Sequence, residues 1–94
     1  MSPLHRCVLR ASGVEQALAR PIAAFEIALL LGVEHFERIA CGEGWSMYVD
    51  EDRAARGLPR NSAAVELAGV DVLGTAVVLP DADFHGGAAQ RLSR

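Results

Sequence analysis

One apolar run, residues 70–79, constrains the fold of this chain more than any other feature of its sequence. In a strand, the odd-numbered and even-numbered positions of this run would face opposite sides, and most residues of each set are aliphatic. Pro80 follows the run directly. A strand that is apolar on both faces must be covered on both faces, so it lies inside a sheet and not at its edge. The sequence therefore predicts a central, doubly covered strand over Val70–Leu79.

Three other segments have strand patterns. Leu4–Arg10 is rich in β-forming residues and predicts a first strand. Glu34–Ala40 and Trp45–Asp50 predict a hairpin, because they flank a glycine-containing turn and the second segment alternates clearly between two faces. For Val14–Ala19 two predictions remain. The segment forms either a second strand that pairs with the first strand or a short helix, since its residues include good helix formers.

Two helices are predicted. The main helix covers Ile22–Leu31 and is apolar over most of its surface, with Glu26 as its one polar residue. The short helix covers residues 62–68 and begins after a cap at Asn61 or Ser62. A stripe as wide as that of the main helix indicates packing against the sheet and, in addition, against a partner subunit.

The predicted class is α+β, with a small mixed or antiparallel sheet of four to five strands, a helix at about 22–31 and a short helix at about 62–68. A chain of 94 residues forms one domain, which is expected over residues 1–80. Residues 81–94 combine Asp, Gly-Gly and basic residues, and are predicted to form a flexible tail.

The hydrophobic fraction, 51%, is high for so small a domain. Small domains bury only part of their surface, so some apolar side chains are expected to be covered by a second copy in a homodimer. The net charge of −3 argues against general nucleic-acid binding, which needs a basic face. Residues 22–33 are too short a stretch for the ~20 residues of a membrane span, and no secretory signal is apparent. We therefore expect a cytoplasmic protein that does not bind membranes.

No cofactor and no metal site are predicted. The three histidines, His5, His35 and His85, are scattered, and neither Cys7 nor Cys41 belongs to a CxxC motif. His5 and Cys7 fall on one face of the first predicted strand. Without a general acid, an oxyanion motif or a strained nucleophile turn, this pair does not predict catalysis.

The loop before the short helix is the candidate ligand site. If Asn61 or Ser62 caps that helix, the free amides of its first turn can hold an anion, and arginines precede it. An aromatic side chain nearby could stack on a base. The candidate anion or nucleotide site comprises Arg53, Arg56, Gly57, Pro59, Arg60, Asn61, Ser62, Trp45 and Tyr48. The alternative is a packing turn at Leu58 and Pro59, with the arginines paired to acidic residues 50–52.

Part of the sequence resembles a known protein family. The motifs that carry it are Tyr48-Val49-Asp50-Glu51, Gly57-Leu58-Pro59-Arg60-Asn61 and Gly74-Thr75-Ala76-Val77-Val78. In these motifs Trp45–Pro80 resembles domain of unknown function 3846, an uncharacterised family of phages, plasmids and actinobacterial genomes. With Ile22–Gly32 and Glu34–Ala40 the resemblance covers roughly two-thirds of the chain, but it departs after Glu51, where the family usually has a Gly-containing turn. It implies a mobile-element setting and no particular reaction.

The favoured hypothesis is a small, non-catalytic binding protein of mobile-element type, which binds a host protein or sequesters an anionic small molecule. An anti-defence role fits that setting by analogy. Two alternatives stay open. One is a metal-dependent enzyme that acts on a phosphate ester or nucleotide through Asp50, Glu51 or Asp52. The other is a structural subunit of a larger complex.

Overall fold

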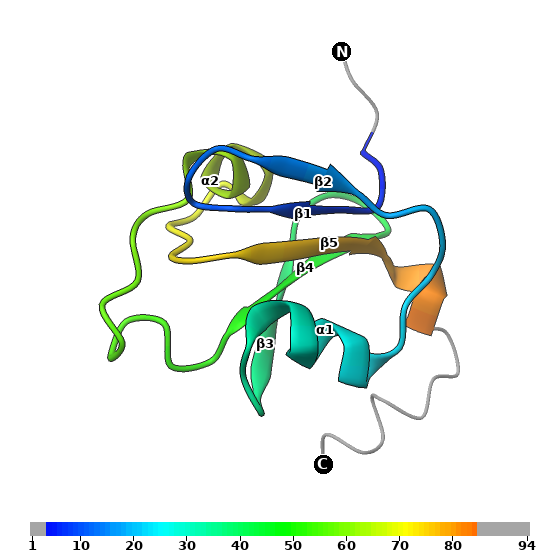
Figure 1. Cartoon of the computed structure of the whole chain (residues 1–94). Helices are drawn as coiled ribbons and strands as arrows, with labels where there is room; N and C mark the ends of the chain where they lie inside the picture. The colour runs from blue at the N-terminus through cyan, green and yellow to red at the C-terminus, as the bar shows by residue number, and fades with distance from the viewer. Residues whose placement is uncertain (1–3, 85–94) are drawn as a thin grey trace.

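The computed structural model of this chain describes residues 4–84 (Figure 1). In chain order its elements are β1 (Cys7–Leu9), β2 (Glu15–Ala17), α1 (Ala24–Leu31), β3 (Phe36–Ala40), β4 (Trp45–Asp50), α2 (Ser62–Ala68), β5 (Ala76–Pro80) and the 3-10 helix η1 (Asp81–Phe84). One sheet and two α-helices make up the described part, so the α+β class predicted from the sequence is confirmed.

The sheet has five strands in the order β2-β1-β5-β4-β3, and each neighbouring pair is antiparallel. β5 lies at its centre, where Val77 stands opposite Val8 of β1 and Tyr48 of β4. The Val77 side chain is fully buried. The prediction of a central strand covered on both faces is therefore confirmed for β5.

The strand predicted over Val70–Leu79 is wrong in its first half, because that half leaves the sheet and runs beside the segment before α2. There the amide of Asn61 donates to the Val72 carbonyl at 2.8 Å, and the amide of Gly74 donates to the Pro59 carbonyl at 2.7 Å. Gly74 has a φ of 80°, a left-handed conformation that interrupts an extended strand. The apolar pattern ahead of Gly74 reflects burial of Val72 under α2, not pairing within the sheet.

The open choice for Val14–Ala19 is settled in favour of a strand, β2. It pairs with β1 so that Leu9 stands opposite Glu15 and Cys7 opposite Ala17. A tight turn joins the two strands, in which the Arg10 amide donates to the Val14 carbonyl at 2.8 Å. Pairing to β1 thus outweighs the helix-favouring composition of this segment.

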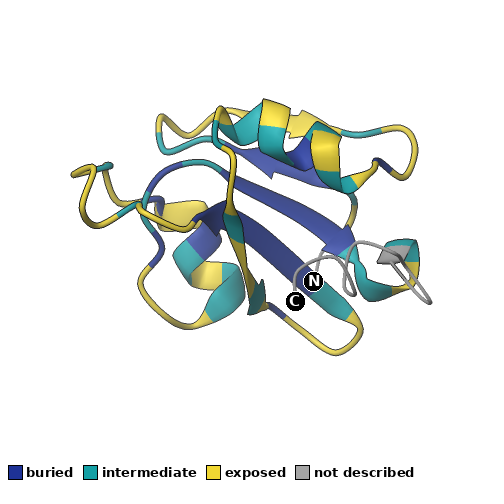
Figure 2. Ribbon diagram, turned by 90° about the horizontal axis from the view of Figure 1, so that it is seen from below, coloured by how far each residue is buried: buried dark blue, intermediate teal, exposed yellow. Residues whose placement is uncertain are grey.

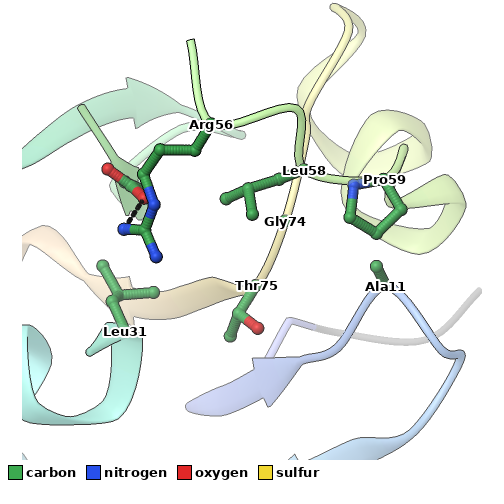
Figure 3. Close-up of a pocket in the computed structure, with 8 residues that line it drawn as sticks. Ala11, Leu31, Arg56, Leu58, Pro59, Gly74 and Thr75 are labelled. Carbon is green, nitrogen blue, oxygen red and sulfur yellow. Dashed lines mark hydrogen bonds and ion pairs between the residues drawn. The ribbon is translucent and has the colours of Figure 1, made fainter. Parts of the chain in front are cut away.

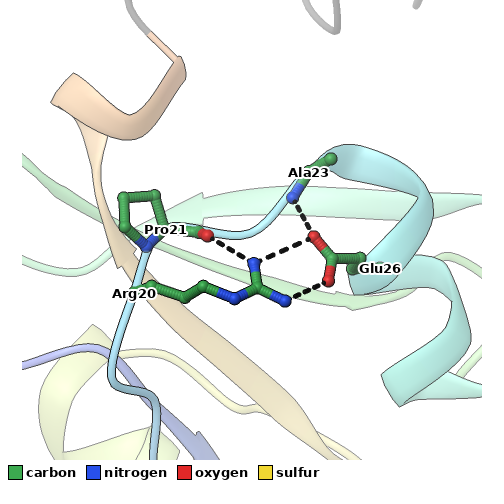
Figure 4. Close-up of polar contacts among 4 residues, drawn as sticks. All are labelled: Arg20, Pro21, Ala23 and Glu26. Atoms are coloured by element: carbon green, nitrogen blue, oxygen red, sulfur yellow. Dashed lines mark hydrogen bonds and ion pairs between the residues drawn. The ribbon is translucent and has the colours of Figure 1, made fainter.

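α1 begins later than the predicted Ile22, because Ala23 has an extended backbone with φ −85° and ψ 166°. A carboxylate stabilises the first turn: Glu26 accepts the Ala23 amide at 2.8 Å and an Arg20 nitrogen at 2.9 Å (Figure 4). Gly32, in the left-handed conformation with φ 71°, ends the helix. The predicted helix is confirmed with a shorter first turn.

α2 has the bounds that the sequence predicts, residues 62–68. The Asn61 side chain accepts the amide of Ala64, so Asn61 and not Ser62 is the cap, and Gly69 ends the helix with φ 75°. Across residues 4–84, no helix combines the length and the apolar character that crossing a bilayer requires.

The two helices cover opposite faces of the sheet, and the buried strands lie between them (Figure 2). On the α1 face the buried hydrophobic residues are Val8, Ile22, Ile27, Tyr48, Val77 and Leu79. On the α2 face they are Cys7, Leu9, Cys41, Met47, Val49, Ala64, Val72, Ala76 and Val78. β4 carries an aromatic residue on each face, with Trp45 against the α2-side cluster and Tyr48 in the α1-side cluster.

Residues 81–84, predicted as the start of a tail, form η1 and are held against the sheet. The Arg6 guanidinium donates to both oxygens of Asp83 at 2.9 and 3.0 Å. The Ser46 hydroxyl donates to Asp81 at 2.6 Å. The rest of the predicted tail, residues 85–94, lies outside the described residues.

Candidate functional site

The arginines between β4 and α2 turn back onto acidic partners. Arg56 Nη1 lies 2.5 Å from Asp50 Oδ2, and Arg53 Nη1 lies 2.9 Å from Glu37 Oε1 on β3. Arg53 also donates to the Asp50 carbonyl at 3.1 Å. Both guanidinium groups therefore already have anionic partners, but only the partner of Arg56 belongs to the acidic residues 50–52 that the packing-turn alternative names, since the carboxylate bound to Arg53 is that of Glu37.

The acidic cluster after β4 does not converge on one point. Asp50 is 4% exposed, and its Oδ1 accepts the Asp52 amide at 2.8 Å while its Oδ2 binds Arg56. Glu51 and Asp52 are exposed. Both oxygens of the buried carboxylate are thus engaged in shaping the turn, and this geometry gives no support to the metal-dependent enzyme.

Asn61 is placed for structure and not for ligand binding. Its side chain is buried, its oxygen accepts the Ala64 amide at 3.1 Å, and its Nδ2 donates to the carbonyls of Leu9 at 2.9 Å and Gly74 at 2.8 Å. Ser62 is exposed beside it. The Asn61 side chain itself therefore holds the amide to which an anion at the start of α2 would bind.

Arg60 and Gly57 have different surroundings from the paired arginines. Arg60 Nε lies 3.7 Å from Asp71 Oδ1, and the two side chains are 58% and 87% exposed, so their attraction is weakened by water. Gly57 is a turn residue with φ 66°, a conformation that favours glycine. Of the predicted arginines, Arg60 has the longest ion pair.

The two aromatic residues lie away from the arginine loop. Trp45 is at the opposite end of β4 from Asp50, where it pairs with Pro80. Tyr48 is buried and meets the Phe36 ring edge-on at a centroid distance of 5.7 Å. Burial is also the main reason that the pKa of Tyr48 is raised. Neither aromatic ring is therefore placed to stack on a base held by the arginines.

A small cleft lies between the end of α1 and the loop before α2 (Figure 3). It is lined by Ala11, Leu31, Asp50, Arg56, Leu58, Pro59, Gly74 and Thr75. Its volume is about 180 Å³, below the roughly 300–1,000 Å³ of most small-molecule sites. Two predicted site residues, Arg56 and Pro59, are among its walls. The cleft combines apolar walls with the polar groups of Thr75 and the Asp50–Arg56 pair, and it is too small for a nucleotide.

The outer face of α1 carries two large apolar side chains. Phe25 is 67% exposed and Leu29 is 74% exposed, and the two lie one turn apart on the same side of the helix. Ile27, on the opposite side, is fully buried against the sheet. Figure 2 shows the exposed stretches of α1 facing away from the sheet. The helix is therefore apolar on both its buried and its exposed side.

Comparisons of the chain with family models, with curated proteins and with solved structures find no match. The resemblance to domain of unknown function 3846 and its mobile-element setting therefore stay predictions. The arguments for function rest on the geometry described above.

Proposed function

We propose that this chain is a small, non-catalytic binding protein whose contact surface is the outer face of α1, and that a second copy of the chain occupies this surface. One observation carries the proposal: Phe25 and Leu29 are 67% and 74% exposed, one turn apart on a helix whose other side already packs on the sheet. Single exposed apolar residues are ordinary, but adjacent large ones on one face indicate an interaction surface.

The chemistry of this surface favours an apolar partner. Within α1 the one charged residue is Glu26, and its carboxylate is bound to Arg20 and to the Ala23 amide. The stripe formed by Phe25 and Leu29 therefore offers neither charge nor hydrogen bonds to a polar ligand. Its main contribution to binding is the burial of apolar area, which is worth about 25 cal/mol per Å².

A second copy meets these requirements without any other component. A two-fold axis places the same stripe on both sides of the contact, so an apolar surface meets an apolar surface. The small residues Ala28 and Gly32 lie beside Leu29 and allow a second helix to approach at 8–10 Å, an ordinary interhelical distance. A standard interface of about 1,600 Å² would extend beyond the helix onto neighbouring segments.

The other hypotheses receive less support from the geometry. The hypothesis that the protein captures an anionic small molecule is less well supported, because Arg53 and Arg56 are already paired with carboxylates. The enzyme hypothesis loses force because both oxygens of Asp50 are engaged. If a host protein and not a second copy occupied the α1 surface, the mobile-element setting that the resemblance implies would make an anti-defence role in the cytoplasm the corresponding function.

Light scattering after size exclusion tests the proposal. We expect the wild-type protein to be a dimer at high micromolar concentration, and Phe25→Ser and Leu29→Ser to be monomers with unchanged circular dichroism. Val70→Ser is the matched control, because Val70 is 52% exposed but lies outside α1. A wild-type protein that is monomeric at that concentration, or a Phe25→Ser variant as dimeric as the control, would overturn the proposal.

A further inference from the structure

We propose that His5, Cys7 and Glu15 form a binding site for a divalent transition metal, with Zn²⁺ as the best-fitting ion. The donor atoms of the three side chains all lie within 4.8 Å of one another. The site stands apart from the α1 surface, on the hairpin of β1 and β2. No sequence motif indicates it, since the three residues are spread over eleven positions of the chain.

The register of the hairpin brings the three residues together. His5 lies two residues before β1, and its side chain reaches Glu15 across the hairpin. Because Leu9 stands opposite Glu15, the Glu15 side chain is on the same face as Leu9 and Cys7 and is a diagonal neighbour of Cys7. The strand pairing that settles the fold of Val14–Ala19 therefore also adds a third potential ligand.

The distances suit a zinc ion after a small adjustment. Zinc binds imidazole nitrogen and carboxylate oxygen at about 2.0–2.2 Å and thiolate sulfur at about 2.3 Å, which puts tetrahedral ligands roughly 3.5 Å apart. His5 Nε2 and Glu15 Oε2 are 2.6 Å apart, joined by a hydrogen bond or ion pair. An ion between them replaces this contact, and these two atoms must separate by about 1 Å to reach the ligand spacing.

The exposure and the charges of the three side chains allow a cation to bind at this point. Cys7 is 3% exposed and forms the floor, whereas the His5 and Glu15 side chains are 55% and 49% exposed, so an ion can enter from solvent. A bound Zn²⁺ displaces the thiol proton, and one thiolate, one carboxylate and a neutral imidazole then balance its two charges.

The ligand types select the ion. Thiolate and imidazole favour Zn²⁺ and its neighbours in the transition series over Mg²⁺ and Ca²⁺, which prefer oxygen ligands. Among residues 4–84 the cluster supplies three protein ligands, which leaves a fourth position for water or a small anion. Cys41 is buried in the same apolar cluster as Cys7 but does not belong to the ligand group.

Titration with Co²⁺, followed by competition with Zn²⁺, tests the site in the full chain. We expect one equivalent of Co²⁺ to give the visible bands of a tetrahedral complex and a thiolate charge-transfer band, both removed by Zn²⁺. His5→Ala and Glu15→Ala should weaken binding at least about tenfold, since even indirect partners of ligands contribute that much. Cys7→Ser should abolish the charge-transfer band.

Matched variants separate this site from adventitious binding. His35→Ala removes another exposed histidine, and Cys41→Ser removes the other buried thiol, and both should bind Co²⁺ as the wild type does. Because His5 and Glu15 are exposed, their variants should fold normally, which circular dichroism checks. The proposal is overturned if wild type gives no tetrahedral spectrum, if His5→Ala and Glu15→Ala bind with wild-type affinity, or if Cys41→Ser and not Cys7→Ser removes the thiolate band.

Discussion

Asn61 joins three segments of the chain through one buried side chain. Its oxygen caps α2 at the Ala64 amide, and its Nδ2 donates to the carbonyls of Leu9 and Gly74. Asn61→Ala removes all three hydrogen bonds and leaves two carbonyls without this partner. At about 1 kcal/mol for each bond, plus a penalty for buried groups that stay unpaired, we expect a loss of at least about 3 kcal/mol in the free energy of unfolding, measured with urea.

Two other variants separate the roles of Asn61. Asn61→Asp keeps the acceptor for the cap but places a carboxylate against the carbonyls of Leu9 and Gly74, so it should be at least as harmful as Asn61→Ala. Ser62→Ala changes the exposed neighbour and should alter stability by less than about 0.5 kcal/mol. If Asn61→Ala costs only about 1 kcal/mol, the usual value for a lost cap, the long-range bonds contribute nothing measurable.

The sequence predicts the local role of Asn61 and misses the long-range one. A cap is a local pattern, because acceptor and amide lie three residues apart. The carbonyl of Leu9 is 52 positions away along the chain, and only the folded backbone brings it within 2.9 Å. The positions of Arg53 and Arg56 are long-range in the same sense, because they depend on Glu37 and on the carboxylate of Asp50, whose orientation a single sequence does not show.

At the scale of an element, the first turn of α1 depends on one carboxylate. Hydrogen bonding to Arg20, and secondly to the Ala23 amide, lowers the pKa of Glu26 from its ordinary 4.5 (Figure 4). A carboxylate whose pKa is lowered by folding stabilises the fold at pH above 4.5, and this contribution disappears as the pH falls below its folded pKa. Glu26→Gln should therefore be less stable than wild type at pH 7, and the difference should vanish in acid.

Thermal unfolding at several pH values measures this difference. Glu66→Gln is the control, because Glu66 is an exposed glutamate of α2. Its Tm should follow the wild-type Tm at every pH apart from a small constant offset. A Glu26→Gln variant whose deficit stays the same from pH 7 to acid would show that the charge of Glu26 does not stabilise α1.

Periodicity predicts most elements, because alternation and helical stripes are local patterns. Periodicity does not predict the secondary structure of a segment whose conformation depends on which other segment it pairs with. Residues 70–75 have the composition of a strand, but they pair with the segment before α2 and not with the sheet neighbours of β5. Val14–Ala19 has helix-forming residues, but β1 offers it an edge. The register of that edge also creates the group of His5, Cys7 and Glu15, which no spacing rule along the chain could indicate.

For the whole molecule, the deciding feature is the balance between apolar side chains and the surface available to bury them. The sheet is covered by α1 on one face and by α2 on the other, so the side chains of β5 are buried on both faces within one chain. Composition correctly predicted that apolar surface would be left over, and the structure locates part of it at Phe25 and Leu29. Which side of the helix faces outward follows from the packing of Ile27 against the sheet.

If a second copy covers Phe25 and Leu29, the stability of the fold must depend on protein concentration. Association that involves only folded chains shifts the unfolding equilibrium by mass action, so the Tm of the wild type should rise with concentration. A tenfold change in concentration corresponds to about 1.4 kcal/mol, which amounts to a few degrees for a dimer of this size. Scanning fluorimetry between low and high micromolar concentration measures the shift.

Phe25→Ser and Leu29→Ser should remove this dependence. In the monomer both side chains are exposed, so the substitutions should change the Tm at low concentration only slightly. At high concentration they should lose the gain that the wild type shows, whereas Val70→Ser, an exposed substitution outside α1, should keep it. A wild-type Tm that is constant over a hundredfold range of concentration would mean that no second copy stabilises the fold, and the exposed face of α1 would then need a different partner.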